Sequence, residues 1–350
     1  MGNFCWGWCC GGGGKLYVID NGWDIHQVSK DLATVVSSAS LPASATGHID
    51  FDAAGNVIVA NGQYLLSYTP SLGGVNWSQL YTDFTQFNDI AIDLSNGWIY
   101  AACHPGTGGA PNIKGVRKFN LSDGSEIATG GWPYDLGTQS SGFPSAIAWS
   151  VAIDSNGDVW VGHYTKSSAG NPTLTKLSSA GSFIADYQPF SVSSGTGPQY
   201  EHPAALAIDS SNNVYCALSR LGTLFTNHLV KLNSSGVKQW GATPDASGNL
   251  GDDVFLFDNE TKVVVSCNVN GSPNNTVYAY NSAGSLLWGD NTNRDMNGIC
   301  RDEDDNLYVA IQDTVGTYTV VSYDKDGNEL DRLSQSAVSG WGFDVGYFPG

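Results

Sequence analysis

Basic residues are scarce in this chain, which has 15 Lys and Arg against 33 Asp and Glu and a net charge of −18 at pH 7. Because nucleic-acid affinity comes mainly from basic side chains that neutralise phosphates, this composition excludes nucleic acid and anionic membranes as partners. An apolar run of about 20 residues is also missing, which excludes a transmembrane helix. The first residues lack a basic start and a long apolar core, so we expect no classical signal peptide.

Helical periodicity is absent over any useful length, and a repeated pattern of short apolar segments takes its place. Six times an apolar segment ends at an aspartate, a short polar turn follows, and a segment rich in Val, Tyr or Trp comes next. These aspartates are Asp52, Asp93, Asp154, Asp209, Asp258 and Asp302. A loose spacing of about fifty residues is typical of propeller-like repeat proteins. The chain is therefore predicted to be an all-β repeat protein.

A second hairpin completes most of the repeats. Alternating segments such as 174–177 and 229–232 are followed by a polar turn that ends in glycine and then by another strand. The turn glycines are Gly181, Gly236, Gly284 and Gly327. Period-two alternation bounded by glycine, where a hairpin needs positive φ, indicates antiparallel strands. Each repeat is thus predicted to be a four-stranded meander, which must pack against its neighbours as blades do in a β-propeller.

The two ends of the chain determine the number of blades. Residues 341–347 have the pattern of a first strand without a successor, whereas residues 16–20 and 25–28 lack a preceding first strand. Joining the two ends makes one composite blade. Together with six internal repeats, it predicts a seven-bladed β-propeller closed by pairing of the N- and C-terminal strands. We expect a Cys/Trp/Gly-rich tail over residues 1–14 and a single propeller domain over residues 15–350.

Two sequence rhythms resemble known families. The repeated motif Ile-Asp-x-x-Gly-Asn-Val-Tyr-Val resembles the repeats of NHL and virginiamycin B lyase-like propellers. The second hairpin ends in Gly-x-x-x-Trp, which resembles the repeats of PQQ-like propellers. The resemblance covers roughly residues 15 to 350 and implies a propeller fold, which many unrelated activities share. The acid/base chemistry of the lyase family needs His and Glu on late blades, and no His follows His228 here. The quinone ligands of the longer dehydrogenases have no counterpart that we can place, so we expect no cofactor.

The seven cysteines form two groups. Cys103, Cys216, Cys267 and Cys300 lie on predicted strands, where a small thiol packs as a hydrophobic residue. The tail contains Phe4, Cys5, Trp6, Trp8, Cys9 and Cys10, a segment too apolar to remain in water. Four interpretations are open, namely docking or cross-linking to a partner, packing on its own propeller, lipidation at Gly2 and Cys5, and metal binding. Docking is favoured, because the thiols lack paired Cys-x-x-Cys spacing and Trp6 departs from the myristoylation motif.

Residues just before the predicted first strands should converge on the mouth of the central channel. They are His48, Asp89, Trp149, His202, Asp253, Asn297 and Trp341. A hydrated, hydrogen-bonded channel entrance explains this mixture, so we assign no catalytic residue and no metal to it. The alternative is a metal-assisted lyase or lactonase-like hydrolase at the axial mouth, because His, carboxylate and amide groups can hold a divalent ion.

Long loops point to recognition. The connections 103–115, 163–173, 219–228 and 268–276 lie between second and third strands, and long loops on a rigid scaffold favour binding. Aromatic residues that could stack on carbohydrate at this face are Trp132, Tyr134, Tyr187 and Tyr200. The sequence therefore predicts a non-catalytic structural or recognition component of an extracellular or viral assembly, for example a bacteriophage virion. Its partners would be proteins, including copies of itself bound through the tail; an intracellular interaction hub is a third hypothesis.

Overall fold

The computed structural model describes residues 14–20, 22–43, 47–105, 115–136, 147–164, 173–188, 200–221, 227–242, 250–268, 277–290, 295–312, 318–334 and 342–349. Within these ranges β-strands joined by turns make seven four-stranded antiparallel sheets. The prediction of an all-β, seven-bladed β-propeller is confirmed. We name the blades A to G in chain order, starting with the blade that contains the first strand of the chain.

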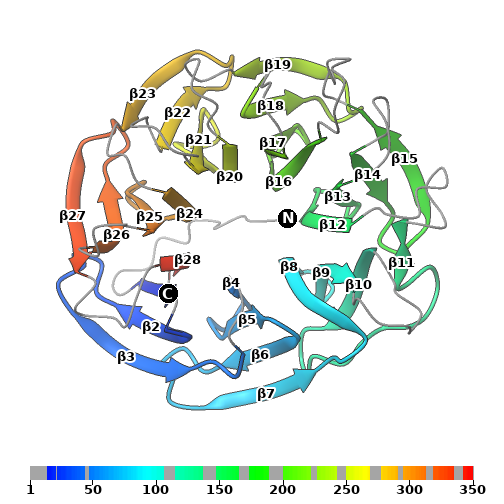
Figure 1. Ribbon diagram of the computed structural model, residues 1–350, viewed down its shortest axis with the longest axis horizontal. Helices are drawn as coiled ribbons and strands as arrows, with labels where there is room; N and C mark the ends of the chain where they lie inside the picture. Colours follow the sequence, from blue (N-terminus) through cyan, green and yellow to red (C-terminus); the bar gives the residue numbers. More distant parts are fainter. Residues whose placement is uncertain are drawn as a thin grey trace. The chain divides into compact units, whose positions relative to one another are not determined.

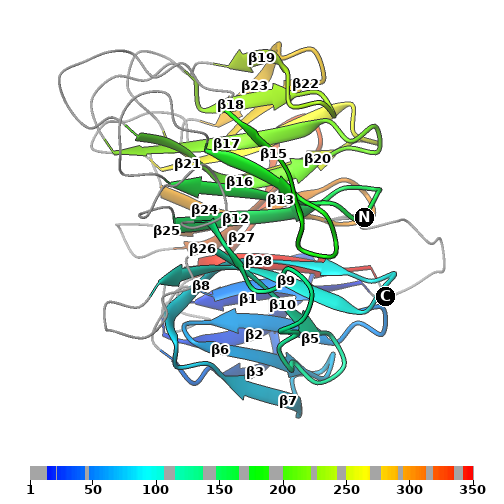
Figure 2. The ribbon, with the colours of Figure 1, turned by 90° about the vertical axis from the view of Figure 1, so that its right-hand side faces the viewer.

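The strands pack within two units, residues 79–251 and residues 4–78 with 252–350. The first unit contains blade C with β8 (Phe84–Asp93), β9 (Trp98–Pro105), β10 (Gly115–Asn120) and β11 (Tyr134–Asp135). It also contains blade D with β12 (Ile147–Ile153), β13 (Val159–Tyr164), β14 (Leu174–Leu177) and β15 (Phe183–Tyr187). Blade E follows with β16 (Tyr200–Ile208), β17 (Val214–Leu221), β18 (Leu229–Leu232) and β19 (Lys238–Ala242). Strand β16 packs beside β12 and β13 (Figure 2), so blades D and E are neighbours.

The second unit contains the other four blades. Blade A comprises β28 (Gly342–Phe348), β1 (Lys15–Asp20), β2 (Asp24–Val28) and β3 (Val35–Ser40), and blade B comprises β4 (Gly47–Phe51), β5 (Val57–Asn61), β6 (Tyr64–Tyr68) and β7 (Val75–Leu80). Blade F comprises β20 (Leu250–Phe257), β21 (Lys262–Asn268), β22 (Val277–Asn281) and β23 (Leu286–Asp290). Blade G comprises β24 (Asp295–Arg301), β25 (Leu307–Gln312), β26 (Tyr318–Tyr323) and β27 (Glu329–Ser334).

The composite blade is present as predicted. Strand β28 pairs antiparallel with β1, with Lys15 opposite Phe348 and Tyr17 opposite Gly346, and the two strands lie side by side in Figure 2. In Figure 1 the red β28 is next to the dark blue strands of blade A. Leu16 of β1 and Tyr347 of β28 enter one core cluster together with residues of blade G. The last strand of the chain is therefore the first strand of the blade that the N-terminal region completes.

The repeated aspartate holds the first hairpin of a blade, as its turn position predicts. In blade D, Asp154 Oδ1 accepts hydrogen bonds from the backbone N–H groups of Asn156 and Asp158 at 2.9 and 3.1 Å. Its Oδ2 accepts from Trp160 Nε1 at 3.1 Å and lies 2.8 Å from Lys176 Nζ. These four contacts account for a carboxylate that has no exposed surface. The third-to-fourth strand turns also behave as predicted, since Gly181 and its equivalents have φ between 74° and 86°.

The core lies between neighbouring blades and consists of strand side chains. Trp160 and Leu174 of blade D pack with Leu206 and Val214 of blade E, and similar clusters join blades C and D and successive blades of the second unit. The four strand cysteines are buried, with exposed fractions of 0 to 5%, as expected for thiols used as small hydrophobic side chains. They are Cys103, Cys216, Cys267 and Cys300.

Candidate functional site

The residues predicted for the channel mouth lie within the first strands rather than just before them. His48 is on β4, Asp89 on β8, Trp149 on β12, His202 on β16 and Asp253 on β20. Asn297 belongs to β24, but its side chain is outside the described residues, as is Trp341. The expectation placed these residues before the strands because the first strands begin earlier than the apolar pattern indicates. Within the first unit the structure brings Trp149 and His202 into contact.

Asp89 joins two blades of the first unit. Its Oδ1 accepts a hydrogen bond from the backbone N–H of Ile90 at 2.8 Å, and its Oδ2 accepts one from the backbone N–H of Val151 in blade D at 2.9 Å. Ser150, on the first strand of blade D, makes the corresponding contact with blade E by donating from Oγ to the backbone oxygen of Pro203 at 2.9 Å. These first-strand polar groups therefore hold blade C to blade D and blade D to blade E.

The second unit repeats this contact twice. Asp253 accepts from Val254 N of its own strand and from Ile299 N of blade G, both at 2.8 Å. Asp344 accepts from Val345 N and from Ile49 N of blade B, again at 2.8 Å. Sequence reasoning missed Asp344. The available signal was an Asp followed by a branched aliphatic residue on a first strand, which Asp89, Asp253 and Asp344 share. We call these three residues the bridging carboxylates.

Burial makes ionisation of the second unit's bridging carboxylates costly. Burial raises the pKa of Asp253 to about 6, although its two backbone hydrogen bonds lower the pKa. Burial raises the pKa of Asp344 well above its usual value, and the negative charges of Asp253 and Asp50 raise it further. Burial also lowers the pKa of His48 on β4 to about 4, so this imidazole is neutral at pH 7. Asp253 and Asp344 are used for hydrogen bonds to the backbone, and the His48 side chain is neutral.

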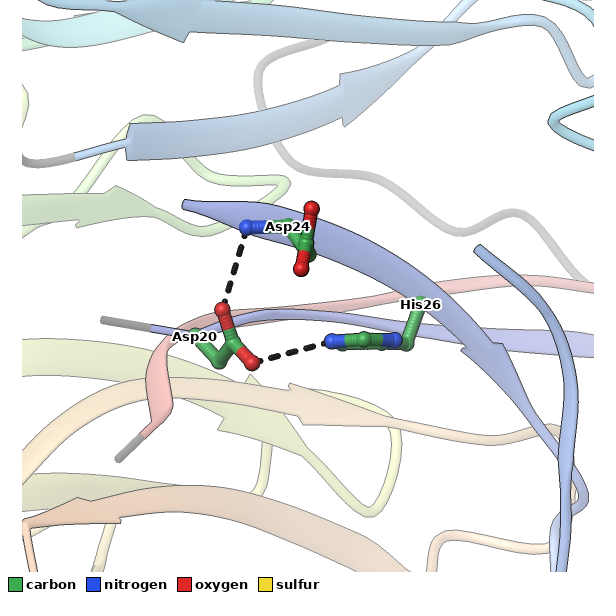
Figure 3. Close-up of side chains that lie close together, drawn as sticks. All are labelled: Asp20, Asp24 and His26. Carbon is green, nitrogen blue, oxygen red and sulfur yellow. Dashed lines mark hydrogen bonds and ion pairs between the residues drawn. The ribbon is translucent and has the colours of Figure 1, made fainter. Parts of the chain in front are cut away.

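A cluster of Asp20, Asp24 and His26 in blade A brings ligand-type atoms within 4.8 Å of one another (Figure 3). Asp20, which is fully buried, accepts from the backbone N–H of Asp24 and from His26 Nε2, both at 3.0 Å. His26 Nδ1 lies 2.7 Å from Ser38 Oγ on β3. Because the Asp20 carboxylate only accepts, Nε2 carries the proton and Nδ1 accepts from Ser38. In this hydrogen-bonded form the imidazole has no lone pair for a metal, and the cluster connects β1, β2 and β3.

A second chain of polar side chains crosses blade D at the corresponding positions. Thr175 lies opposite Asp186 in the strand register, as His26 lies opposite Ser38 in blade A. Thr175 Oγ1 donates to Asp186 Oδ1 at 2.6 Å, and His163 Nε2 lies 2.9 Å from the same hydroxyl. Because the Thr175 hydroxyl donates its proton to Asp186, its oxygen accepts a hydrogen bond from Nε2–H of His163. Nδ1 of His163 therefore carries a lone pair. Burial, with a smaller contribution from His202, lowers the pKa of His163 to about 3.

His202 of blade E contacts an aromatic residue of blade D. Its ring packs edge-on against Trp149 with centroids 5.0 Å apart, and only 5% of the residue is exposed. Trp149 reaches this position at an irregularity in the pairing of β12, where the register shifts between Ala148 and Ser150. Sequence reasoning singled out Trp149 and His202 but missed His163, because Thr175 and the Asp186 carboxylate beyond it come from two other strands.

Two of the predicted carbohydrate-stacking residues are not accessible. Trp132 is 5% exposed and donates from Nε1 to the backbone oxygen of Ser179 at 3.0 Å, and Tyr134 is fully buried. The expectation was wrong for these two because the segment around them enters the two-residue strand β11 and the core of blades C and D. Tyr187 stacks on Trp160 at 5.1 Å, and the side chain of Tyr200 is outside the described residues.

The tail predicted to dock the protein is also outside the described residues, and this applies to Phe4, Cys5, Trp6, Trp8, Cys9 and Cys10. In the part of the chain that the structure describes, no helix is long and apolar enough to cross a membrane.

No family model and no curated protein matches this chain. It is similar in fold to a functionally unknown protein from Desulfotomaculum acetoxidans, with 15% identity, a TM-score of 0.59 and coverage of 97% of this chain and 100% of the other. BamB from Moraxella catarrhalis shows 12% identity and a TM-score of 0.51, with coverage of 91% and 82%.

The extracellular domain of a proposed hybrid two-component system from B. thetaiotaomicron shows 12% identity and a TM-score of 0.55. The match covers 84% of this chain but 34% of that larger one. At such identities the comparisons show a shared propeller fold, and neighbours with this fold include proteins of unknown function and an extracellular domain.

Proposed function

We propose that this chain is a non-catalytic propeller that acts as a structural and recognition component of a larger extracellular or viral assembly, such as a bacteriophage virion. The main support for the proposal is that the bridging carboxylates are fully occupied by hydrogen bonds to the backbone. Asp89, Asp253 and Asp344 each commit both oxygens to backbone N–H groups, one of them on the next blade. A ligand would have to replace these bonds, so the carboxylates suit a rigid scaffold better than a reaction centre.

The lengths of the connections support presentation of loops. Residues 106–114, 165–173, 222–228 and 269–276 separate second and third strands in blades C to F. By contrast, residues 178–182 join the third and fourth strands of blade D in a turn closed by a hydrogen bond from Gly181 N to the backbone oxygen of Ser178. Long connections on a rigid scaffold are where proteins commonly carry recognition surfaces.

Exposed aliphatic and aromatic side chains on fourth strands suit a protein partner. Phe183 and Ile184 on β15 are 47% and 45% exposed, and Leu286 and Leu287 on β23 are 56% and 45% exposed. A fourth strand is the outer edge of its sheet, where unpaired backbone groups are also available. Consecutive exposed hydrophobic residues favour protein contacts over solvent, and the net charge of −18 disfavours nucleic acid.

The N-terminal segment 4–10 is proposed as the anchor to the assembly. Mass analysis of protein prepared without reductant tests this part. We expect covalent species of twofold or threefold mass that collapse on reduction and are missing from the variant Cys5→Ser/Cys9→Ser/Cys10→Ser. The strand cysteines provide the internal control, because burial raises the pKa of the thiols of Cys103 and Cys216 and disfavours the reactive thiolate. A wild-type chain that stays monomeric without reductant, and a triple variant that still enters the native assembly, would contradict the proposal.

The absence of catalysis has its own test. Lactone hydrolysis and lyase activity are assayed with the wild type and with Asp89→Asn, since Asp89 belongs to the mouth residues of the alternative hypothesis. Equal background rates are expected for both proteins. Turnover by the wild type that Asp89→Asn removes while retaining the circular dichroism spectrum would replace the scaffold proposal by the enzyme.

A further inference from the structure

The fourth strands of the blades differ in what they expose. A fourth strand is an edge of its sheet, and natural edge strands usually carry charged or polar side chains that discourage the addition of a further strand. The exposed positions of β3, β7, β19 and β27 follow this rule, since they include Ser40, Asn76, Lys238 and Glu329, respectively. Strands β15 and β23 do not, because none of their exposed residues has a polar side chain.

Blade F has the more open of these two edges. Strand β23 is the last in the sheet order β20-β21-β22-β23 (Figure 1), and it exposes Leu286 and Leu287 by 56% and 45% together with Gly289. Leu286 is paired with Tyr280 and Gly289 with Tyr278, two positions on the same face of β22. A glycine on an edge strand leaves its backbone uncovered, and an aromatic side chain on an added strand packs over such a position.

One segment of this chain has the matching pattern. Residues 4–10, which are outside the described residues, read Phe-Cys-Trp-Gly-Trp-Cys-Cys, with an aromatic residue at every second position from Phe4 to Trp8. In an extended strand this alternation places the three aromatic rings on one face and small residues on the other. A short uncharged segment that is rich in aromatic residues and free of proline tends to pair as a strand. At about 3.4 Å per residue, it is long enough to cover the five residues of β23.

Charge also favours a contact between these two stretches of the chain. Each molecule has a net charge of −18, so two copies repel each other over most of their surfaces. Neither residues 4–10 nor residues 282–289 contain a charged side chain. The fourth strand of blade G, by contrast, exposes Glu329 and Asp331. A second copy is therefore opposed at β27 but not at β23.

We propose that residues 4–10 of one copy of the chain add to blade F of a second copy as a fifth strand beside β23. Backbone hydrogen bonds give such strand addition its affinity, and contacts of alternate side chains give it specificity. The aromatic side of the segment covers Leu286 and Gly289, which removes exposed apolar surface from both partners. The inference rests on the proposed function, because it names the surface that receives the proposed anchor. Since the donor and acceptor surfaces differ, the copies form dimers by reciprocal exchange or longer chains.

Sedimentation velocity of the full chain tests this contact. The parent carries Cys5→Ser/Cys9→Ser/Cys10→Ser, so that disulfides contribute nothing, and its average mass should rise with concentration. The edge variant Leu287→Lys places a charge on β23, and the tail variant Trp6→Ser/Trp8→Ser removes two aromatic rings from the segment, so each should be monomeric. Ile184→Lys is the matched control, since it places the same charge on β15 at a residue that is also 45% exposed, and it should associate as the parent does.

A mixture of the two variants gives the sharpest result. The tail variant keeps its β23 edge and the edge variant keeps its segment 4–10. The mixture should therefore contain a 1:1 complex, although neither protein associates alone. In that complex, amide hydrogen exchange should be slowed at residues 286–290 of the tail variant, which an isotope label distinguishes from the edge variant. Leu286→Lys, at a residue that is 56% exposed, serves as the edge variant if Leu287→Lys does not fold.

A parent that stays monomeric at millimolar concentration would overturn the inference, and so would a mixture without a complex. Association that is lost in Ile184→Lys but retained in Leu287→Lys would place the contact on blade D and overturn it equally. Failure of this inference is separable from failure of the proposed anchor. Disulfide-linked species that form from the chain with its native tail cysteines, with and without Leu287→Lys, would keep the anchor and remove β23 as its acceptor.

Discussion

Replacement of Asp253 by asparagine should remove a pH-dependent part of the free energy of unfolding. The carboxyl group has a pKa of about 6 in the folded chain, against a usual value of 3.8, because burial disfavours the charged form. The folded chain therefore takes up a proton as the pH falls through 6, whereas the unfolded chain does so only near 3.8. Stability from this group is lost as pH rises through 6 and is fully present below 3.8, the reverse of the usual behaviour of an aspartate.

The shift of about 2 pKa units corresponds to about 3 kcal/mol between the two limits. Between pH 7.5 and pH 4.5 the expected change is about 2 kcal/mol, since the unfolded chain begins to protonate at the lower value. Asparagine has a single carbonyl oxygen, so one of the N–H groups of Val254 and Ile299 loses its acceptor. This loss costs about 1–3 kcal/mol and does not depend on pH.

Urea unfolding at several pH values between 4.5 and 7.5 measures the effect. The wild type should gain about 2 kcal/mol of stability relative to Asp253→Asn as the pH is lowered. Asp344 adds a contribution of the same sign, because the Asp253 charge raises the pKa of Asp344 in the wild type and is absent from the variant. Asp326→Asn is the matched control, since that side chain is 65% exposed, and its difference from the wild type should be constant. A difference between the wild type and Asp253→Asn that does not change with pH would refute the reasoning.

Three further changes test the architecture. Gly162→Ala should destabilise the fold by about 1–3 kcal/mol, because the new Cβ would lie 2.8 Å from a backbone oxygen of blade E. Gly74→Ala is the control, since its Cβ would lie 3.8 Å from the nearest atom and the change should be nearly neutral. Urea unfolding measures both variants. Deletion of residues 342–350 removes the first strand of blade A and should abolish the cooperative thermal transition, so an unchanged melting temperature would contradict the composite blade. Trp160→Phe removes the indole N–H that donates to the buried Asp154 carboxylate at 3.1 Å, and it should lower the free energy of unfolding by about 1–3 kcal/mol. A variant as stable as the wild type would show that this hydrogen bond is dispensable.

The strand order within each blade was predictable because it depends on neighbouring segments. Asp154 and Gly181 specify their own hairpins through hydrogen bonds to residues two to four positions away, and such contacts are visible as a repeat. The composite blade was predictable for a related reason, since each end of the chain carries part of the same repeat. Buried cysteines followed from their positions on apolar strands.

The site residues were predictable only in part. Asp89, Trp149, His202 and Asp253 were selected as polar residues near first strands, but their roles depend on which backbone or ring faces them. Trp132 shows the opposite error, since a position beside a proline resembles a loop although the side chain enters the core. No spacing in the chain connects His163 to Thr175 and Asp186, because these contacts are made across strands.

Composition and repeat pattern determined by themselves that this protein is acidic and all-β, and that it consists of four-stranded units closed by its two ends. The tertiary structure alone decided which polar groups hold neighbouring blades together. The physical reason is distance along the chain. Ile49 N donates to Asp344 across 295 residues, and a contact of that kind exists only after the blades have packed.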